Sequence, residues 1–171
     1  EAKINIKSTI NLVCGDVRSL PFKEQSFDIV LSFFTSFGYF YSDEENFQHL
    51  KNSAQVLKNE GIFFLDYLNP QKAKKLSRKY VSTKSFENLK ILETKWFDSI
   101  LNRINKEVVI KTTNGDVIKS YIETVKIYEF HQIRDMLVKC GIEIIGTYGD
   151  YSFSKFTEKS PRLIILGKKH G

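Results

Sequence analysis

The stretch from Asn11 to Tyr41 limits the possible folds more than any other part of the chain. We expect a strand over Thr9–Gly15, followed by Asp16, a loop and a second apolar run over Phe27–Phe34 that ends in small and aromatic residues. A carboxylate past the tip of one buried strand and a small-residue loop past the tip of another form nucleotide sites in open α/β sheets. We therefore interpret this stretch as half of a cofactor pocket.

The next segments follow the order strand, helix, strand. Phe27–Phe34 has the continuous apolar pattern of a strand that is buried on both faces. Ser42 and Glu45 form a capping box that begins a helix, and Asn59-Glu60-Gly61 ends it with the glycine in the left-handed conformation. Ile62–Leu68 has the pattern of another buried strand. This order predicts a right-handed crossover between two parallel strands.

The pattern changes to a period of two residues in the second half of the chain. Gln71–Lys84 is polar and basic, and we expect it to be helical or irregular. Alternating segments then predict antiparallel strands over Ile91–Asp98, Lys106–Thr112 and Val117–Ile127. The Asn114-Gly115 pair predicts a tight hairpin between the last two strands. The remaining expected elements are a helix over Tyr128–Cys140 and strands over Ile142–Tyr148 and Leu163–Gly167.

Length and composition favour one ordinary globular domain. The chain has 171 residues, of which 42% are hydrophobic and 27% charged. The net charge of +6 comes from scattered lysines, a pattern that favours a solvated surface over nucleic acid binding. Cys14 and Cys140 lie in separate apolar segments, which predicts reduced core thiols in a cytoplasmic protein. We expect neither a membrane span, which needs roughly 20 apolar residues, nor a signal peptide, nor a metal site.

The motifs, taken in order, resemble the C-terminal two-thirds of class I S-adenosylmethionine-dependent methyltransferases. The segments that carry the resemblance are Gly15-Asp16-Val17, Leu20-Pro21-Phe22, Ser26–Val30, Phe34–Phe40, Leu57–Gly61 and Phe63–Asp66. Three further segments are similar to narrower groups: Tyr148–Tyr151 and Ser160–Ile164 to a bacterial and archaeal branch, and Ser36–Tyr39 to a loop of sugar N-methyltransferases. The resemblance implies a Rossmann-like, mostly parallel α/β sheet with an antiparallel excursion after the third buried strand. It also implies that the Gly-rich cofactor loop and the acidic ribose-binding residue precede Glu1.

The resemblance implies S-adenosylmethionine as the cofactor and assigns four residues to it. The carboxylate of Asp16 would accept a hydrogen bond from the adenine amine, and the backbone N–H of Val17 would donate to a ring nitrogen. The backbone of Ser32 and the ring of Phe33 would face the cofactor. Loop capping is the alternative role of Asp16, and core packing is the alternative role of Phe33.

Methyl transfer mainly requires alignment of two substrates and exclusion of water, and sometimes a base. The candidate substrate-binding residues are Ser36, Tyr39, Tyr67, Asn69, Tyr128 and Arg162. Structural alternatives are a helix-entry turn for Ser36, capping for Asn69 and an ion pair with Asp150 for Arg162, whose functional role would be to contact an anionic substrate. No residue is assigned as the catalytic base. His49 has the position of a solvated or partly packed helix residue.

These observations predict one methyltransferase-like domain over residues 1–171, with an antiparallel lid over residues 86–127. The expected function is S-adenosylmethionine-dependent methyl transfer to an N or O atom of a small-molecule acceptor. Two alternatives stay open. One is an inactive remnant or scaffold domain that lacks the Gly-rich cofactor loop. The other is an RNA methyltransferase, which the net charge favours. The sequence is also compatible with a homo-oligomer.

Overall fold

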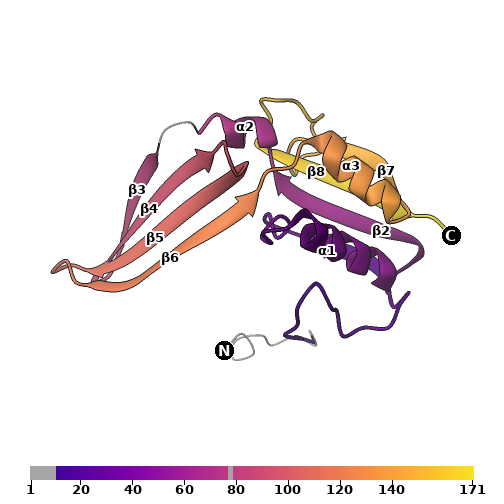
Figure 1. Ribbon diagram of the computed structural model, residues 1–171, viewed down its shortest axis with the longest axis horizontal. Helices are drawn as coiled ribbons and strands as arrows, with labels where there is room; N and C mark the ends of the chain where they lie inside the picture. The colour runs from indigo at the N-terminus through magenta and orange to yellow at the C-terminus, as the bar shows by residue number, and fades with distance from the viewer. Residues whose placement is uncertain (1–10, 77–78) are drawn as a thin grey trace.

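The computed structural model describes residues 11–76 and 79–171, which form two four-stranded sheets (Figure 1). Sheet A has the strand order β1 (Phe27–Ser32), β2 (Leu57–Leu68), β8 (Arg162–Lys169) and β7 (Ile142–Tyr148). β1 pairs parallel with β2, which confirms the predicted parallel pairing. β8 lies antiparallel to both of its neighbours. β1, β2 and β7 therefore run in the same direction, and β8 makes the sheet mixed, because a loop without a crossover helix leads from β7 to β8. The expected mostly parallel sheet is confirmed in part.

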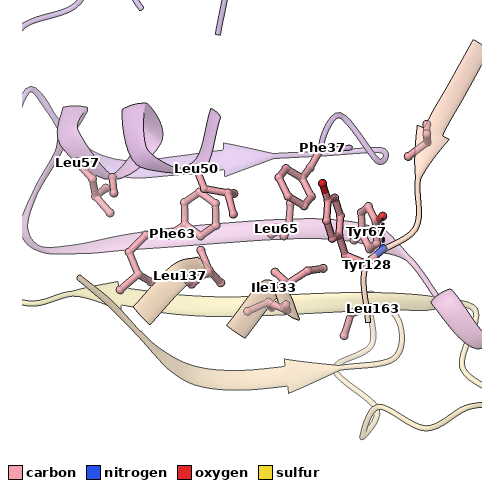
Figure 2. Packing of buried hydrophobic residues seen from close by; sticks show 14 residues of the cluster. Phe37, Leu50, Leu57, Phe63, Leu65, Tyr67, Tyr128, Ile133, Leu137 and Leu163 are labelled. Carbon is pink, nitrogen blue, oxygen red and sulfur yellow. Dashed lines mark hydrogen bonds between the residues drawn. The ribbon is translucent and has the colours of Figure 1, made fainter. Parts of the chain in front are cut away.

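The hydrophobic core lies on one face of sheet A, against α1 (Asp43–Val56) and α3 (Phe130–Lys139) (Figures 1 and 2). Phe63, Leu65 and Tyr67 alternate along β2, so that all three side chains point to this face and are fully buried. The helices contribute Leu50, Ala54, Ile133 and Leu137 to the same cluster. The first helix therefore packs on sheet A through its apolar side.

The junction between α1 and β2 differs from the prediction. The predicted cap Ser42 accepts a hydrogen bond from the backbone N–H of Glu45, as expected. However, α1 ends at Val56 and β2 begins at the next residue, so Asn59-Glu60-Gly61 belongs to the strand. The left-handed conformation falls on Glu60, with φ of 63°, instead of the glycine. A register shift in the pairing of β1 with β2 accommodates this irregular stretch.

The other face of sheet A is uncovered along β1. Ile29, Leu31 and Phe33 have exposed fractions of 55%, 54% and 42%. The expectation that Phe27–Phe34 is buried on both faces is therefore wrong, because α1 and α3 of the described residues pack on the opposite face of sheet A and no strand pairs with the outer edge of β1. In the described structure, β1 is an edge strand with an apolar outer face.

The expected strand over Thr9–Gly15 is absent from residues 11–15, which are exposed and have neither strand nor helix structure. Thr9 and Ile10 lie outside the described residues. A strand needs a neighbour that pairs with its backbone groups, and residues 11–15 pair with none of the strands in the described ranges. Cys14 is exposed, contrary to the expected core position, whereas Cys140 is half-buried and burial raises the pKa of its thiol to about 11.

Sheet B extends away from sheet A as an antiparallel wing (Figure 1). Its strands are β3 (Tyr80–Phe86), β4 (Leu89–Asp98), β5 (Arg103–Thr112) and β6 (Val117–Lys126), and the short helix α2 (Pro70–Lys74) precedes them. Gly115 has φ of 102° in the turn between β5 and β6, which confirms the predicted hairpin. β3 was not predicted, because its sequence is polar and its side chains are mostly exposed. Backbone hydrogen bonds to β4 therefore stabilise this edge strand.

Candidate functional site

A buried carboxylate holds together the carboxyl end of sheet A. Asp66, near the end of β2, has no exposed surface. Its Oδ1 accepts a hydrogen bond from Nε of Arg162 at 2.6 Å, and its Oδ2 accepts from the backbone N–H of Phe34 at 2.9 Å and the hydroxyl of Tyr151 at 2.6 Å. Arg162 therefore pairs with Asp66, and the expected pair with Asp150 is wrong. Asp150 instead accepts hydrogen bonds from backbone N–H groups of its own loop.

These contacts fix an unusual turn just past the tip of β1. Phe34 and Thr35 have φ of 54° and 60°, a left-handed conformation that costs a non-glycine residue about 1–3 kcal/mol. The backbone N–H of Thr35 donates to the carbonyl oxygen of Asp66 at 3.0 Å, and Nη2 of Arg162 donates to Oγ1 of Thr35 at 2.8 Å. The Asp66 network thus offsets the strain and determines where the turn lies.

A cavity of about 320 Å³ lies between this turn and sheet B. We call it the lid cavity. The turn contributes Phe34 and Thr35 to its lining, and β8 of sheet A contributes Arg162. Sheet B contributes Lys95, Lys106 and Glu123. Tyr39 from the connecting loop and Asn105 of β5 complete the polar lining. Burial, together with the nearby Glu123 carboxylate, raises the pKa of the Tyr39 phenol, so this hydroxyl remains a hydrogen-bond donor at neutral pH.

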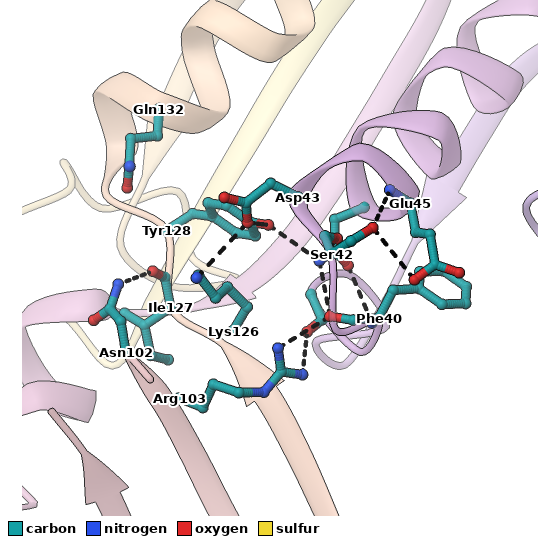
Figure 3. A network of polar contacts seen from close by, with 12 residues as sticks. Phe40, Ser42, Asp43, Glu45, Asn102, Arg103, Lys126, Ile127, Tyr128 and Gln132 are labelled. Atoms are coloured by element: carbon teal, nitrogen blue, oxygen red, sulfur yellow. Dashed lines mark hydrogen bonds and ion pairs between the residues drawn. The ribbon is translucent and has the colours of Figure 1, made fainter. Parts of the chain in front are cut away.

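Arg103 of β5 joins sheet B to the loop that carries Tyr39 (Figure 3). Its side chain is 3% exposed and donates hydrogen bonds to three consecutive carbonyl oxygens, of Gly38 at 3.3 Å, Tyr39 at 3.2 Å and Phe40 at 3.0 Å. Gly38 has φ of 95°, and a Cβ atom there would lie 2.9 Å from the carbonyl oxygen of Lys126. The close approach of this loop to β6 therefore requires glycine.

Three of the candidate substrate residues hold the scaffold in this structure. Tyr67 is fully buried and donates its hydroxyl to the carbonyl oxygen of Lys126, and burial raises its pKa. The Tyr128 hydroxyl donates to Asp43 at 2.6 Å, and burial also raises the pKa of Tyr128. Asn69 caps α2 and donates through Nδ2 to carbonyl oxygens of the loop before β8. None of the three lines the lid cavity.

A second cavity, of about 340 Å³, lies beside β1 and α1. We call it the β1 cavity. Apolar walls come from Val17, Leu20, Val30 and Leu31, and polar groups come from Ser32, Ser36, His49 and Ser53. The hydroxyl oxygens of Ser32 and Ser36 are 2.8 Å apart.

His49 of α1 supplies the one unsatisfied polar atom identified in the buried parts of residues 11–76 and 79–171. Its side chain is 6% exposed, and its Nδ1 has no hydrogen-bond partner among the described residues. Burial lowers the pKa of His49 to about 4, so the imidazole is neutral at physiological pH. Apolar walls, hydroxyls and a neutral imidazole fit an uncharged polar group such as a nucleoside.

The candidate cofactor residues divide into two groups. Val17 and Ser32 line the β1 cavity, as does the substrate candidate Ser36. Asp16 lies outside that lining. Its carboxylate accepts hydrogen bonds from the backbone N–H of Arg18 at 2.8 Å and from the Arg18 guanidinium at 2.6 Å. These contacts lower the pKa of Asp16 to about 2. The ring of Phe33 packs against Phe64, with centroids 5.1 Å apart.

The sequence did not identify several of the residues that shape these cavities. The strand register alone makes neighbours of Lys95, Lys106 and Glu123. The sequence around each residue therefore does not predict that the three lie close together. In the sequence alone, Arg103 has the pattern of an ordinary charged residue near the start of a strand. Among the described residues, no group of His, Cys, Asp or Glu side chains is placed to hold a metal ion, and no helix is long and apolar enough to cross a membrane.

Comparisons with known proteins agree with this arrangement. The sequence pattern of a methyltransferase domain family matches residues 1–65. An uncharacterised protein of Methanocaldococcus jannaschii is 28% identical over 143 residues, which cover 84% of this chain and 50% of the relative. The chain thus spans about half the length of the curated relative that it matches.

Three solved structures share the fold. The CcbJ methyltransferase from Streptomyces caelestis has a TM-score of 0.79 at 16% identity, over 93% of this chain and 63% of that chain. An S-adenosylmethionine-dependent methyltransferase from Clostridium acetobutylicum has a TM-score of 0.78 at 17% identity, over 93% and 64%. The sugar N-methyltransferase KedS8 from Streptoalloteichus has a TM-score of 0.68 at 14% identity, over 92% and 61%.

The family match over residues 1–65 shows similarity to a methyltransferase domain, and the chain has the fold of class I S-adenosylmethionine-dependent methyltransferases. S-adenosylmethionine is the methyl donor of this class.

Proposed function

We propose that the protein transfers a methyl group from S-adenosylmethionine to an N or O atom of a small-molecule acceptor, as a cytoplasmic enzyme. The β1 cavity would hold part of the donor, and the lid cavity would hold the acceptor. The observation that carries this proposal is the turn that the Asp66 network fixes. Ser32 and Ser36 line the β1 cavity, whereas Phe34 and Thr35, between them in the sequence, line the lid cavity.

The residues of the β1 cavity fit the donor in chemical type. S-adenosylmethionine, when bound, supplies an electrophilic methyl group on a sulfonium centre. Ser32, Ser36 and the unpartnered Nδ1 of His49 offer hydrogen bonds, and the side chains of Val17 and Leu20 offer an apolar wall. The backbone N–H of Val17 is our candidate donor to a ring nitrogen of adenine.

The lid cavity supplies alignment for the acceptor. Methyl transfer needs the acceptor atom in line with the bond that breaks, and water excluded from the site. Thr35 and Tyr39 present hydroxyls to the cavity, and the raised pKa of Tyr39 makes it a donor instead of a base. The fold likeness to a sugar N-methyltransferase supports a small polar acceptor with an amine or hydroxyl group.

Calorimetric titration of S-adenosylhomocysteine into the full-length protein tests the donor site. We expect micromolar affinity and a clear loss of affinity in Ser36→Val, which removes a hydroxyl from the β1 cavity. Ser120→Val is the matched control, because Ser120 lies exposed on β6 of sheet B. Absence of binding by the wild-type protein would instead support the inactive scaffold that the sequence left open.

A further inference from the structure

Two lysines face each other across sheet B at the lid cavity. Lys95 of β4 lies directly opposite Lys106 of β5, and Lys106 lies directly opposite Glu123 of β6. Directly opposite residues point to the same face of a sheet, and all three side chains line the lid cavity. Like charges in this position destabilise a sheet, so the two lysines place positive charge at the cavity and lower the stability of the fold.

The carboxylate of Glu123 forms an ion pair with only one of the two lysines. Nζ of Lys106 lies 2.6 Å from Oε2 of Glu123, and this hydrogen bond raises the pKa of Lys106. Glu93, on the same face, pairs with Lys84 at 3.8 Å. Lys95 forms no ion pair with any carboxylate of the described residues. One ammonium group is therefore left without a counter-charge at the cavity.

Arg162 on the opposite wall also has hydrogen-bonding capacity to spare. Its Nε and Nη2 donate to Asp66 and Thr35, whereas Nη1 has no hydrogen-bond partner in the described part of the chain. The side chain is 27% exposed and lines the lid cavity. The Asp66 contacts hold the guanidinium plane in a fixed orientation. A fixed N–H group and a flexible ammonium group thus border the same space.

We propose that the acceptor carries an anionic group, a carboxylate or a phosphate, which the lid cavity binds through Lys95 and Nη1 of Arg162. This inference deepens the proposed function and rests on it, because the bound anion is called a methyl acceptor only if the protein is a methyltransferase. The charge-assisted hydrogen bonds of an arginine and a lysine suit both kinds of anion. Glu123 and the hydroxyl of Tyr39 remain to orient the uncharged or amine-bearing part of the acceptor.

Anion titration into the full-length protein, saturated with S-adenosylhomocysteine, tests the site directly. The probes are inorganic phosphate and malonate, which separate the two anion types, and the readout is the methyl NMR shifts of Ile104 and Val125 in the cavity lining. We expect saturable shifts with at least one probe, and about tenfold weaker binding in Lys95→Gln. Lys90→Gln is the matched control, because Lys90 lies exposed on the other face of β4.

The outcomes separate this inference from the proposed function. Equal binding by wild type and Lys95→Gln, shifts confined to residues outside the cavity, or no saturable shift would overturn the anion site. The titration of S-adenosylhomocysteine is read before the anion is added, so a failed donor site is recognised independently. In a second assay, wild type should methylate glucosamine 6-phosphate or glucosaminic acid faster than glucosamine, and Lys95→Gln should lose that preference. Methylation without any such preference would leave the methyltransferase proposal standing and refute the anionic acceptor.

Discussion

Asp66 shows how one buried side chain determines the geometry of a binding site. Its carboxylate and carbonyl oxygens anchor the strained Phe34–Thr35 turn, and its charge fixes Arg162. The local sequence around each partner gives no reason for this arrangement, because the partners come from three separate segments. The residue therefore acts through the positions of others and need not touch a substrate.

Replacement of Asp66 by asparagine should lower the free energy of unfolding by about 3 kcal/mol, because it leaves the guanidinium of Arg162 without its charge partner. Urea denaturation measures this loss. Asp150→Asn is the control, since Asp150 bonds only to its own exposed loop, and its stability should stay close to that of wild type. Equal stability of the two variants would contradict the anchoring role of Asp66.

His49 should make stability depend on pH in a defined window. Burial lowers its pKa from 6.5 to about 4, so between these values the unfolded chain binds a proton that the folded protein does not. Stability should therefore fall as pH decreases from 6.5 to 4, by up to about 3 kcal/mol. His49→Phe should remove most of this slope in pH-dependent denaturation, and an unchanged slope would show that other groups cause it.

Asp16 and Arg18 give opposite predictions for donor binding. If the Asp16 carboxylate binds the adenine amine, Asp16→Ala should weaken the binding of S-adenosylhomocysteine by about tenfold. Arg18→Ala should preserve or improve binding, because it releases the carboxylate from the present ion pair. Calorimetry on both variants of the full-length protein decides the case. Weaker binding in Arg18→Ala alone would show that the pair itself shapes the site.

At the scale of elements, sheet B and the loop after β1 form one unit. Arg103 and the backbone N–H of Lys126 both donate to the carbonyl oxygen of Gly38, the second at 2.7 Å. These contacts place Tyr39 at the lid cavity, although the loop belongs in sequence to sheet A. A movement of sheet B would therefore move the polar lining of the site.

Arg103→Met should loosen this connection more than Arg103→Lys, because methionine removes the donor to three carbonyl oxygens, of which only those of Gly38 and Phe40 keep another donor. We expect the amide of Lys126 to exchange with solvent faster, with a local opening free energy lower by about 1–3 kcal/mol. Hydrogen exchange at the amides of β1 and β2 is the internal control and should change less. Equal acceleration in both sheets would indicate global destabilisation.

The sequence predicted the helices, strands and turns better than it predicted which of them lie side by side. The helix cap at Ser42, the Asn114-Gly115 hairpin and the strand Ile142–Tyr148 follow from local chemistry, and the structure contains all three. The burial of β1 and the strand at residues 11–15 were predicted wrongly, because both depend on neighbouring strands that local pattern cannot supply. For the same reason, the row of Lys95, Lys106 and Glu123 could be recognised only from the strand register in the structure.

At the scale of the whole molecule, the uncovered face of sheet A exposes apolar side chains of β1. Ile29→Lys with Leu31→Lys in residues 1–171 should change the free energy of unfolding by no more than about 0.5 kcal/mol, because both side chains are exposed. The binding of a hydrophobic dye should decrease. Phe63→Lys, on the covered face, is the contrasting variant and should prevent folding. A large loss of stability in the double variant would mean that another surface covers this face in solution.

The turn at Phe34 and Thr35 places the two cavities on separate halves of the molecule, with sheet B bordering only one of them. Under the proposed function, exchange of the wing at residues 80–126 would change the cavity proposed for the acceptor and leave the cavity proposed for the donor unchanged. Such an exchange would have to keep Arg103, which donates to the Gly38 carbonyl oxygen, and the close approach of β6 that requires glycine at this position.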